Sequence, residues 1–295
     1  VYKRQMEAVR DGVMETADDS ALFQSWGSIT IINPLEKIWN GYSDTRMGAS
    51  MDSYLNGYND PRLPVYFQPV TEGDNKGEYR GVANGMPNPQ QDDYKAMSAP
   101  NVQEKSTDSP LRWMMASEVA FLRAEGAMRG WTAEMGGTAE EFYNKGIELS
   151  FLENGLSADA AARYAADETS KPTDFTDVST ANTKYNISAL GKITIKWNAG
   201  ASEEEQLERI ITQKWIAMFP NGTEAWSEFR RTGYPLIFPV RSNYPTSGVD
   251  TNKQIRRMVF PQSEYSNNGA AVQEAVKLLG GPDNGGTKLW WDKKN

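Results

Sequence analysis

Carboxylates are the side chains of this sequence that could do chemistry. Glu118 and Glu125 fall on one stripe of a predicted amphipathic helix, and adjacent acids occur elsewhere, as at Glu140-Glu141. Paired carboxyls hydrolyse glycosidic bonds when they lie about 5–5.5 Å apart (retaining) or about 6.5–9.5 Å apart (inverting). Buried carboxylates are more often held by cations. We therefore predict that Glu118 and Glu125 form structural salt bridges to arginines, with glycoside hydrolysis as the less favoured alternative.

Composition excludes most other chemistry. The 295 residues include no His and no Cys, so histidine-based triads, thiolate nucleophiles and the common zinc sites are ruled out. The net charge of −8 disfavours non-specific binding to nucleic acid, because phosphates would be repelled. No apolar run reaches the length of a membrane-spanning helix. Carboxylate chemistry, lysine chemistry or no chemistry remains, and we expect no cofactor, no metal and no binding to nucleic acid.

The first part of the chain, residues 1–109, is predicted to be loop-rich. Pro, Gly, Asn and Asp interrupt it at short intervals, as in "YNDPRLPVYFQPV", where an Asp-Pro turn is favoured over a calcium site. Short strands are expected at Ser28–Ile32 and Val65–Phe67. Helices are expected at Leu35–Trp39 and near Ala49–Tyr58.

The second part, residues 110–295, is predicted to form helical hairpins joined by loops. Ser109 and Pro110 give a start signal for a helix whose apolar stripe runs to Met128. The next helix is expected to start at the capping box of Thr138 and Glu141.

This pair of helices fits the tetratricopeptide pattern. Ala139, Tyr143 and Gly146 occupy the small, aromatic and small positions of its second helix. One such hairpin cannot bury its own apolar face, so neighbouring units must pack on it. We expect a mostly α fold in which tetratricopeptide-like hairpins pack against a large loop-rich region with a few short strands.

A second hairpin is predicted around the Pro220–Gly222 break. Ser202 caps its first helix, and Trp215 and Trp226 are expected on its two facing helices. Burying each indole would remove roughly 150–250 Å² from water, which favours a packing role for both. Before this hairpin, "KITIKW" alternates apolar and polar residues, so it is a half-buried strand or extended stretch.

Aromatic residues in loops suggest a binding surface. Trp39, Tyr42 and Trp197 lie in turn-rich stretches with polar neighbours. Flat aromatic faces stack on the C–H faces of sugar rings, while neighbouring amides and guanidinium groups bond to the hydroxyls. Each such aromatic is individually more often part of a core. We select Trp39, Tyr42 and Trp197 as the candidate ligand-binding residues.

Several stretches, in order along the chain, together resemble the SusD/RagB family of outer-membrane nutrient-binding lipoproteins. They are "YNDPRLPVYFQP", "YRGVANGMPN", "SEVAFLRAEGAMRGW", "AEEFYNKGIELSF", "ITQKWIAMFPNGTEAWSEFRRTGYP", "RRMVFPQSEYSNN" and "LWWDKK". The resemblance implies one SusD-like domain over residues 1–295, on the extracellular face of the outer membrane. It implies a non-catalytic protein that captures oligosaccharides or other nutrients and passes them to a SusC-like TonB-dependent transporter.

The resemblance also implies that part of the domain precedes this sequence. The family carries a lipidated N-terminal Cys, its membrane anchor, and earlier helical hairpins, none of which is found between Val1 and Asn295. The remaining alternative, from a different class, is a helical-repeat adaptor that binds peptides along its hairpins. Exposed aromatics in the loop-rich half would favour sugar, whereas a groove along the hairpins would favour peptide.

We expect the chain on its own to be poorly soluble, because helix faces meant for the preceding hairpins would be exposed to water. Sedimentation of the purified chain and its thermal melt measure this. High solubility together with a sharp cooperative melt would contradict it.

Overall fold

The structure is a computed structural model that describes residues 2–86, 90–101, 110–243 and 247–294. It is mostly helical, with a single small antiparallel sheet among the described residues. In chain order the elements are α1 (Tyr2–Arg10), η1 (Ala17–Asp19), β1 (Ala21–Phe23), α2 (Pro34–Glu36), the π-helical turn η2 (Lys37–Gly41), α3 (Ala49–Gly57), α4 (Leu63–Tyr66), α5 (Gln91–Tyr94), β2 (Leu111–Met114), α6 (Ala116–Met128), α7 (Thr132–Met135), α8 (Ala139–Leu152), α9 (Ala158–Ala165), α10 (Glu203–Ala217), α11 (Gly222–Thr232) and α12 (Gln262–Leu278).

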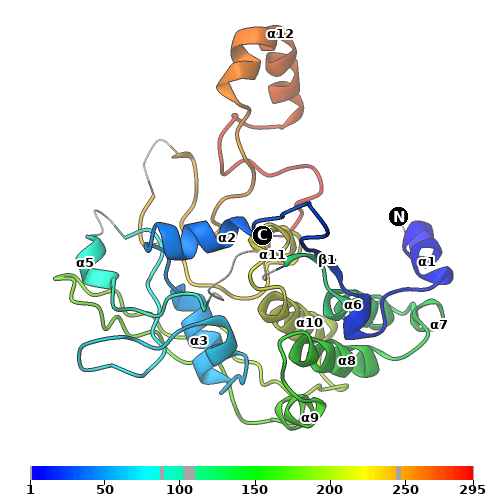
Figure 1. The fold of residues 1–295 in the computed structure, drawn as a ribbon. Coiled ribbons are helices and arrows are strands. Elements are labelled where there is room, and N and C mark those ends of the chain that lie inside the picture. The colour runs from blue at the N-terminus through cyan, green and yellow to red at the C-terminus, as the bar shows by residue number, and fades with distance from the viewer. Residues whose placement is uncertain (1, 87–89, 102–109, 244–246, 295) are drawn as a thin grey trace.

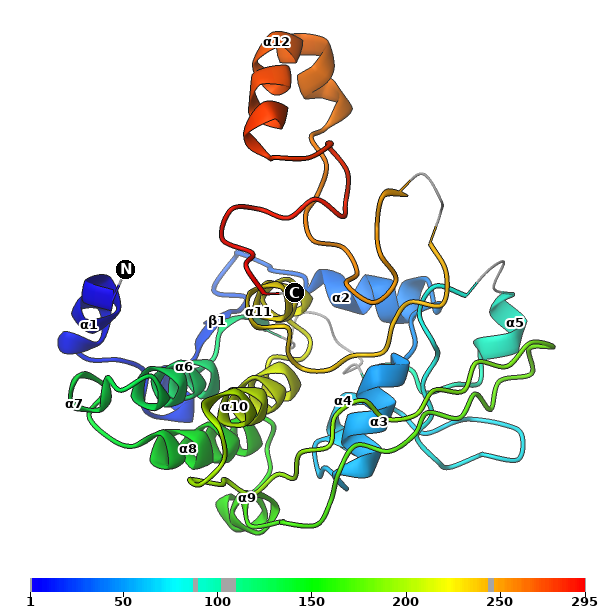
Figure 2. The ribbon, with the colours of Figure 1, turned by 180° about the vertical axis from the view of Figure 1, so that it is seen from behind.

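The helices and the loops occupy different sides of the molecule. Figures 1 and 2 show α6, α8, α9 and α10 packed side by side, with α3 and long irregular segments beside them. The predicted fold class, helical hairpins against a loop-rich region, is confirmed. No helix of the described residues is long and apolar enough to cross a bilayer.

The first predicted hairpin is formed by α6 and α8. Thr138 caps α8 and closes the predicted capping box with Glu141. At Gly146 an added Cβ would lie 2.7 Å from the ring of Phe121, so only glycine lets α6 and α8 approach this closely. The hydroxyl of Tyr143 donates to the carbonyl of Ile195, which ties the hairpin to the extended stretch that follows α9.

The predicted start of α6 was wrong. Leu111–Met114 forms β2, and the helix begins only at Ala116; Ser109 lies outside the described residues. β2 pairs with β1 in antiparallel register, and Trp113 stacks on Phe23 with ring centroids 4.8 Å apart. Pairing with a strand almost ninety residues earlier overrides the local start signal.

Two predicted strands were also wrong. Val65 and Tyr66 belong to the short helix α4, in which Pro64 occupies the first turn, a position that proline favours. In Ser28–Ile32, Ile29 makes a single bridge to Trp26 and no strand forms. The predicted helices at Leu35–Trp39 and Ala49–Tyr58 correspond to α2 with η2 and to α3.

The two tryptophans of the second hairpin pack in different places. Trp215 of α10 meets the edge of Tyr54 at 5.7 Å, between ring centroids. The indole N–H of Trp226 donates to the carbonyl of Ile255 at 2.8 Å, and the Arg230 guanidinium lies 3.5 Å from its ring centroid. Both have packing roles, as predicted, but they do not face each other. Each joins the hairpin to another part of the chain.

A lobe stands away from the body at the C-terminal end. It contains α12, of which only Val272 is buried, and Figures 1 and 2 show it connected to the rest by two chain segments. Asp283 holds its base together. This carboxylate pairs with Arg257 and accepts hydrogen bonds from the hydroxyl of Tyr265 at 2.7 Å and from the backbone N–H of Phe260.

A fully buried ion pair joins the loop-rich half to the helices. Arg62 donates through Nε and Nη2 to the two carboxylate oxygens of Asp60, at 2.9 and 2.6 Å, and both side chains are 0% exposed. Its Nη1 donates to Ser150 of α8 at 2.9 Å and its Nη2 to Gln213 of α10 at 3.0 Å. Tyr164 of α9 donates to Asp60 at 2.8 Å. One side chain pair thus reaches three helices.

Replacing Arg62 by methionine should be severely destabilising. Arg62→Met leaves the Asp60 carboxylate buried without its counter-ion, so we expect the free energy of unfolding to fall by about 3–5 kcal/mol. Arg163→Met is the matched control, since Arg163 is exposed on α9; its effect should stay within about 0.5 kcal/mol. Denaturant unfolding of both variants measures this, and equal midpoints would contradict the proposed importance of the pair.

Candidate functional site

A cluster of aromatic rings lies where the loop-rich half meets the end of α10. Trp39 of η2 is half-buried and stacks parallel to Phe219, with centroids 6.1 Å apart and an interplanar angle of 6°. Phe219 follows α10 and also contacts Tyr66 at 4.8 Å and Phe67 at 5.0 Å. Three separate segments therefore converge on one aromatic wall.

This wall bounds a cavity of about 560 Å³ that opens to solvent. The polar lining combines side-chain amides with three charged groups, and the rest is apolar. The amides are Asn33, Asn101, Asn154 and Asn221, and the charged residues are Glu36, Arg112 and Glu153. A smaller cavity of about 240 Å³ shares Trp39 and Phe219 with the first. This combination suits a sugar ring, which stacks on aromatic faces while its hydroxyls hydrogen-bond to amide and charged side chains.

The charged groups of the larger cavity differ in how they are satisfied. Glu153 accepts from the hydroxyl of Ser117 at 2.6 Å, from its backbone N–H at 2.9 Å and from the hydroxyl of Ser20 at 3.2 Å. Burial raises the pKa of Glu153. Arg112 donates to the side chain of Asn154 at 2.9 Å. The acid is thus fully engaged, whereas the guanidinium has donors to spare.

The structure does not bring the three candidate residues together. Trp39 lines both cavities, and Tyr42, just after η2, is 60% exposed, with the Lys37 ammonium 6.0 Å from its ring centroid. Trp197 is only 8% exposed and packs on Tyr143 with centroids 5.2 Å apart. It lies in the core beside a different hollow, between α8 and α9. In "KITIKW" apolar and polar residues alternate, and the apolar side that Trp197 shares with Ile193 and Ile195 faces the core.

Sequence reasoning missed most of the cavity. Phe219, Tyr66 and Arg112 were not selected. Phe219 had a signal, because it directly precedes the Pro-Asn-Gly break, where the chain leaves α10. Tyr66 carries the same signal as Trp39, because it is an aromatic residue in the turn-rich stretch "PRLPVYFQPV". Nothing local marks Arg112, since the pairing of β2 with a distant strand places it.

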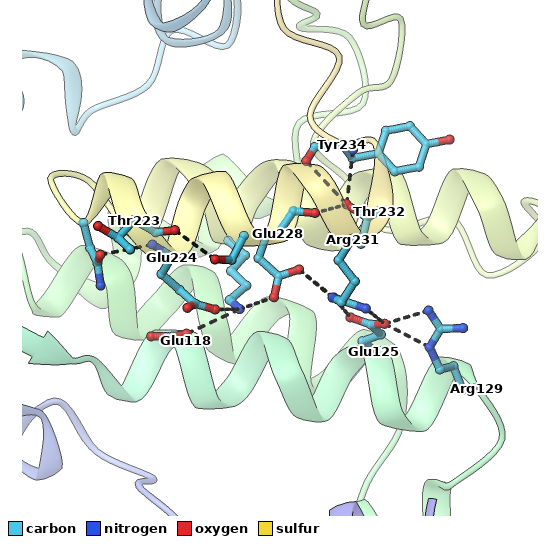
Figure 3. A network of polar contacts seen from close by, with 12 residues as sticks. Glu118, Glu125, Arg129, Thr223, Glu224, Glu228, Arg231, Thr232 and Tyr234 are labelled. Atoms are coloured by element: carbon cyan, nitrogen blue, oxygen red, sulfur yellow. Dashed lines mark hydrogen bonds and ion pairs between the residues drawn. The ribbon is translucent and has the colours of Figure 1, made fainter. Parts of the chain in front are cut away.

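The two carboxylates of α6 belong to a buried ion-pair network (Figure 3). Lys214 of α10 is 1% exposed, and its ammonium lies 2.8 Å from Glu228, 3.4 Å from Glu118 and 3.6 Å from Glu224. The carboxylates of Glu118 and Glu228 therefore share a cation contributed by a third helix. Glu118 is paired as predicted, but its partner is a lysine and not an arginine.

Glu125 is held by arginines, as predicted. It accepts from Arg231 of α11 at 2.6 and 2.7 Å and from Arg129 at 2.7 and 2.9 Å. Arg231 also pairs with Glu228 at 2.5 Å, which links the two parts of the network. These carboxylates bond to cations of their own chain, so they are not offered to a substrate. No group of three or more His, Cys, Asp or Glu residues able to hold a metal ion occurs among the described residues.

The two glutamates respond differently to burial. Burial raises the pKa of Glu118, and Lys214 offsets this only in part. Burial also tends to raise the pKa of Glu125, but the hydrogen bonds and charges of Arg231 and Arg129 outweigh this effect, so the pKa is lowered. The folded state therefore favours ionised Glu125 and tolerates neutral Glu118.

Comparison with known proteins identifies the family. Residues 2–292 match the SusD-like family, described as SusD and RagB outer membrane lipoproteins. The chain belongs to this family, as its sequence predicted. The outer-membrane location expected from the sequence agrees with that description. No curated protein matches the chain.

Solved structures of relatives share the fold. A SusD-like protein from Bacteroides thetaiotaomicron is 43% identical, with a TM-score of 0.91, and the match covers 100% of this chain and 60% of that one. A chitin-binding SusD homolog from Flavobacterium johnsoniae is 42% identical, with a TM-score of 0.88, over 98% of this chain and 57% of that one. A homolog from Bacteroides vulgatus is 36% identical, with a TM-score of 0.89, over 100% and 57%. The chain thus spans less than two thirds of these relatives.

The opposite pKa shifts predict opposite sensitivities. Glu125→Gln removes a charge that two arginines need, so we expect the free energy of unfolding at pH 7 to fall by about 2–3 kcal/mol. Glu118→Gln places a neutral amide where burial already raises the pKa of the acid and so disfavours its charged form, and the loss should therefore stay below about 1 kcal/mol.

The pH dependence of unfolding provides the check. Because its folded pKa is lowered, Glu125 stabilises the fold fully above about pH 4.5, and this contribution is lost as the pH falls through the folded pKa. The difference between wild type and Glu125→Gln should therefore shrink on acidification. A constant difference, or a larger effect of Glu118→Gln, would contradict the assignment.

Proposed function

We propose that the protein binds an oligosaccharide against the aromatic wall of Trp39, Phe219 and Tyr66. It acts at the cell surface without catalysis and hands the ligand to a SusC-like TonB-dependent transporter. The cavity supports this proposal because stacked rings and four amide side chains line the same space. The relative from Flavobacterium johnsoniae binds chitin, which makes chitin oligosaccharides the first ligands to try.

The distribution of exposed aromatics carries the proposal over its alternative. Trp26 is 81% exposed, Trp113 66% and Tyr42 60%, and all three lie outside the helical hairpins. Exposed large apolar residues on the hairpin helices α6 and α8 are the leucines Leu122 and Leu152. Aromatic side chains on the loop-rich side fit sugar better than a peptide groove along the hairpins.

A non-catalytic role is part of the proposal. The acids of α6 are bound to Lys214 and to arginines, and Glu153 of the cavity is engaged by Ser20 and Ser117. This leaves Glu36 as the cavity carboxylate for which no partner is described. Of the two carboxyls among the described lining residues, only Glu36 is therefore free to act on a ligand, whereas glycoside hydrolysis needs two that cooperate.

Removal of the Trp39 ring should weaken binding. We expect Trp39→Ala to reduce the affinity for chitin oligosaccharides by about 1–3 kcal/mol, the usual contribution of an aromatic stacking platform. Trp290→Ala is the control, since Trp290 is 82% exposed and does not line the cavity. Isothermal titration calorimetry measures both, with circular dichroism to check folding. Equal affinities of Trp39→Ala and wild type would disprove the location of the site.

A further inference from the structure

Arg112 offers a hydrogen-bond donor that no described residue of the chain uses. Its Nη1 is buried and has no partner in the part of the chain that the structure describes. The residue lines the cavity of the aromatic wall, on β2, where pairing with Leu22 of β1 fixes the backbone. A buried donor left unbonded is costly, and such costs are often found where a ligand completes the bond.

The guanidinium is also held in a fixed orientation. Its Nη2 donates to Oδ1 of Asn154 at 2.9 Å. The amide nitrogen of Asn154 donates in turn to the carbonyl of Ser150 at 2.7 Å and to the hydroxyl of Tyr66 at 3.3 Å. Tyr66 belongs to the aromatic wall, so the charge and the stacking surface are positioned by one set of contacts.

No carboxylate of the described residues lies within ion-pair distance of Arg112, although its charge acts to lower the pKa of Glu153, which burial raises. Among the described ion pairs, none includes Arg112, whereas the buried cations Arg62 and Lys214 have carboxylate partners. The nearer candidate, Glu153, is turned to the hydroxyls of Ser20 and Ser117. A cation that is partly desolvated and unpaired favours an anionic ligand.

We propose that Arg112 binds the carboxylate of an acidic sugar, so that the cavity selects glycans containing uronic acid residues over their neutral counterparts. The proposal deepens the proposed function and rests on it. The sugar ring lies on the aromatic wall, and one carboxylate oxygen accepts from Nη1. Asn154 takes one N–H of Nη2, so the ligand is bound through Nη1, which has no other partner among the described residues.

The remaining acid of the cavity acts against such a ligand. Glu36 of α2 lines the same space and repels a carboxylate. Arg112 and Glu36 therefore have opposite effects on the discrimination between acidic and neutral sugars. Replacing each residue should therefore change the preference for acidic sugars in opposite directions, which gives two independent tests of the proposal.

The test compares oligogalacturonate with galactose oligomers of the same length and linkage, which differ only in the carboxylate at C6. Titration calorimetry on the full chain should show the acidic oligomer binding at least about tenfold more tightly. Arg112→Met should abolish this preference, and Glu36→Gln should increase it. Arg163→Met removes the same charge from the exposed face of α9 and should leave the preference unchanged.

Each outcome decides something. If neutral oligomers bind at least as tightly as acidic ones, or Arg112→Met keeps the preference, the acidic subsite is disproved. If neutral glycans nevertheless bind and Trp39→Ala weakens their binding, the proposed function stands without the acidic subsite. If neither the galacturonate nor the galactose oligomer binds but chitin oligosaccharides do, the acidic subsite is disproved and the proposed function stands; if none of the three binds, both proposals fail. A preference that Arg163→Met reduces as much as Arg112→Met would reflect overall charge and would also overturn the subsite.

Discussion

The buried pair of Asp60 and Arg62 is the constraint on which the arrangement of the molecule depends. A guanidinium with no exposure to water must find acceptors for its donors inside the protein. The acceptors come from α8 and α10 and from Asp60 itself, and the same acid is bonded by Tyr164 of α9. The turn between α3 and α4 can thus occupy only one place against the helices.

The geometry of the candidate site follows from this constraint. α4 begins at Leu63, directly after Arg62, and ends at Tyr66, whose ring contacts Phe219. The ring of Phe219 in turn stacks on the ring of Trp39. In the helical half, Lys214 is neutralised by Glu228 and Glu118, whereas Arg112 at the cavity has no carboxylate within ion-pair distance among the described residues.

Sequence reasoning predicted what local signals determine. The capping box of Thr138, the small residue at Gly146 and the spacing of the apolar stripes identified the α6–α8 hairpin, because each acts within one or two helical turns. β2 was mistaken for helix because its structure depends on a partner strand far away in the chain. Trp39 was found as a loop aromatic, but the same criterion chose Trp197, whose alternating pattern suits a core equally well. Tyr66 met this criterion too but was not selected, and Arg112 could not be found, since only tertiary placement brings it beside the aromatic rings.

The α12 lobe has its own consequence for how the chain opens. With Val272 as the sole buried residue of α12, this helix contributes little apolar burial, and the attachment of the lobe rests on the polar contacts of Asp283 and on the two chain segments that connect it to the body. Such a unit separates from the rest at a small fraction of the global free energy. Amide hydrogens of Gln262–Leu278 would then exchange with solvent through local opening of the lobe alone. Those of α6, α8 and α10 would exchange only when the whole protein unfolds.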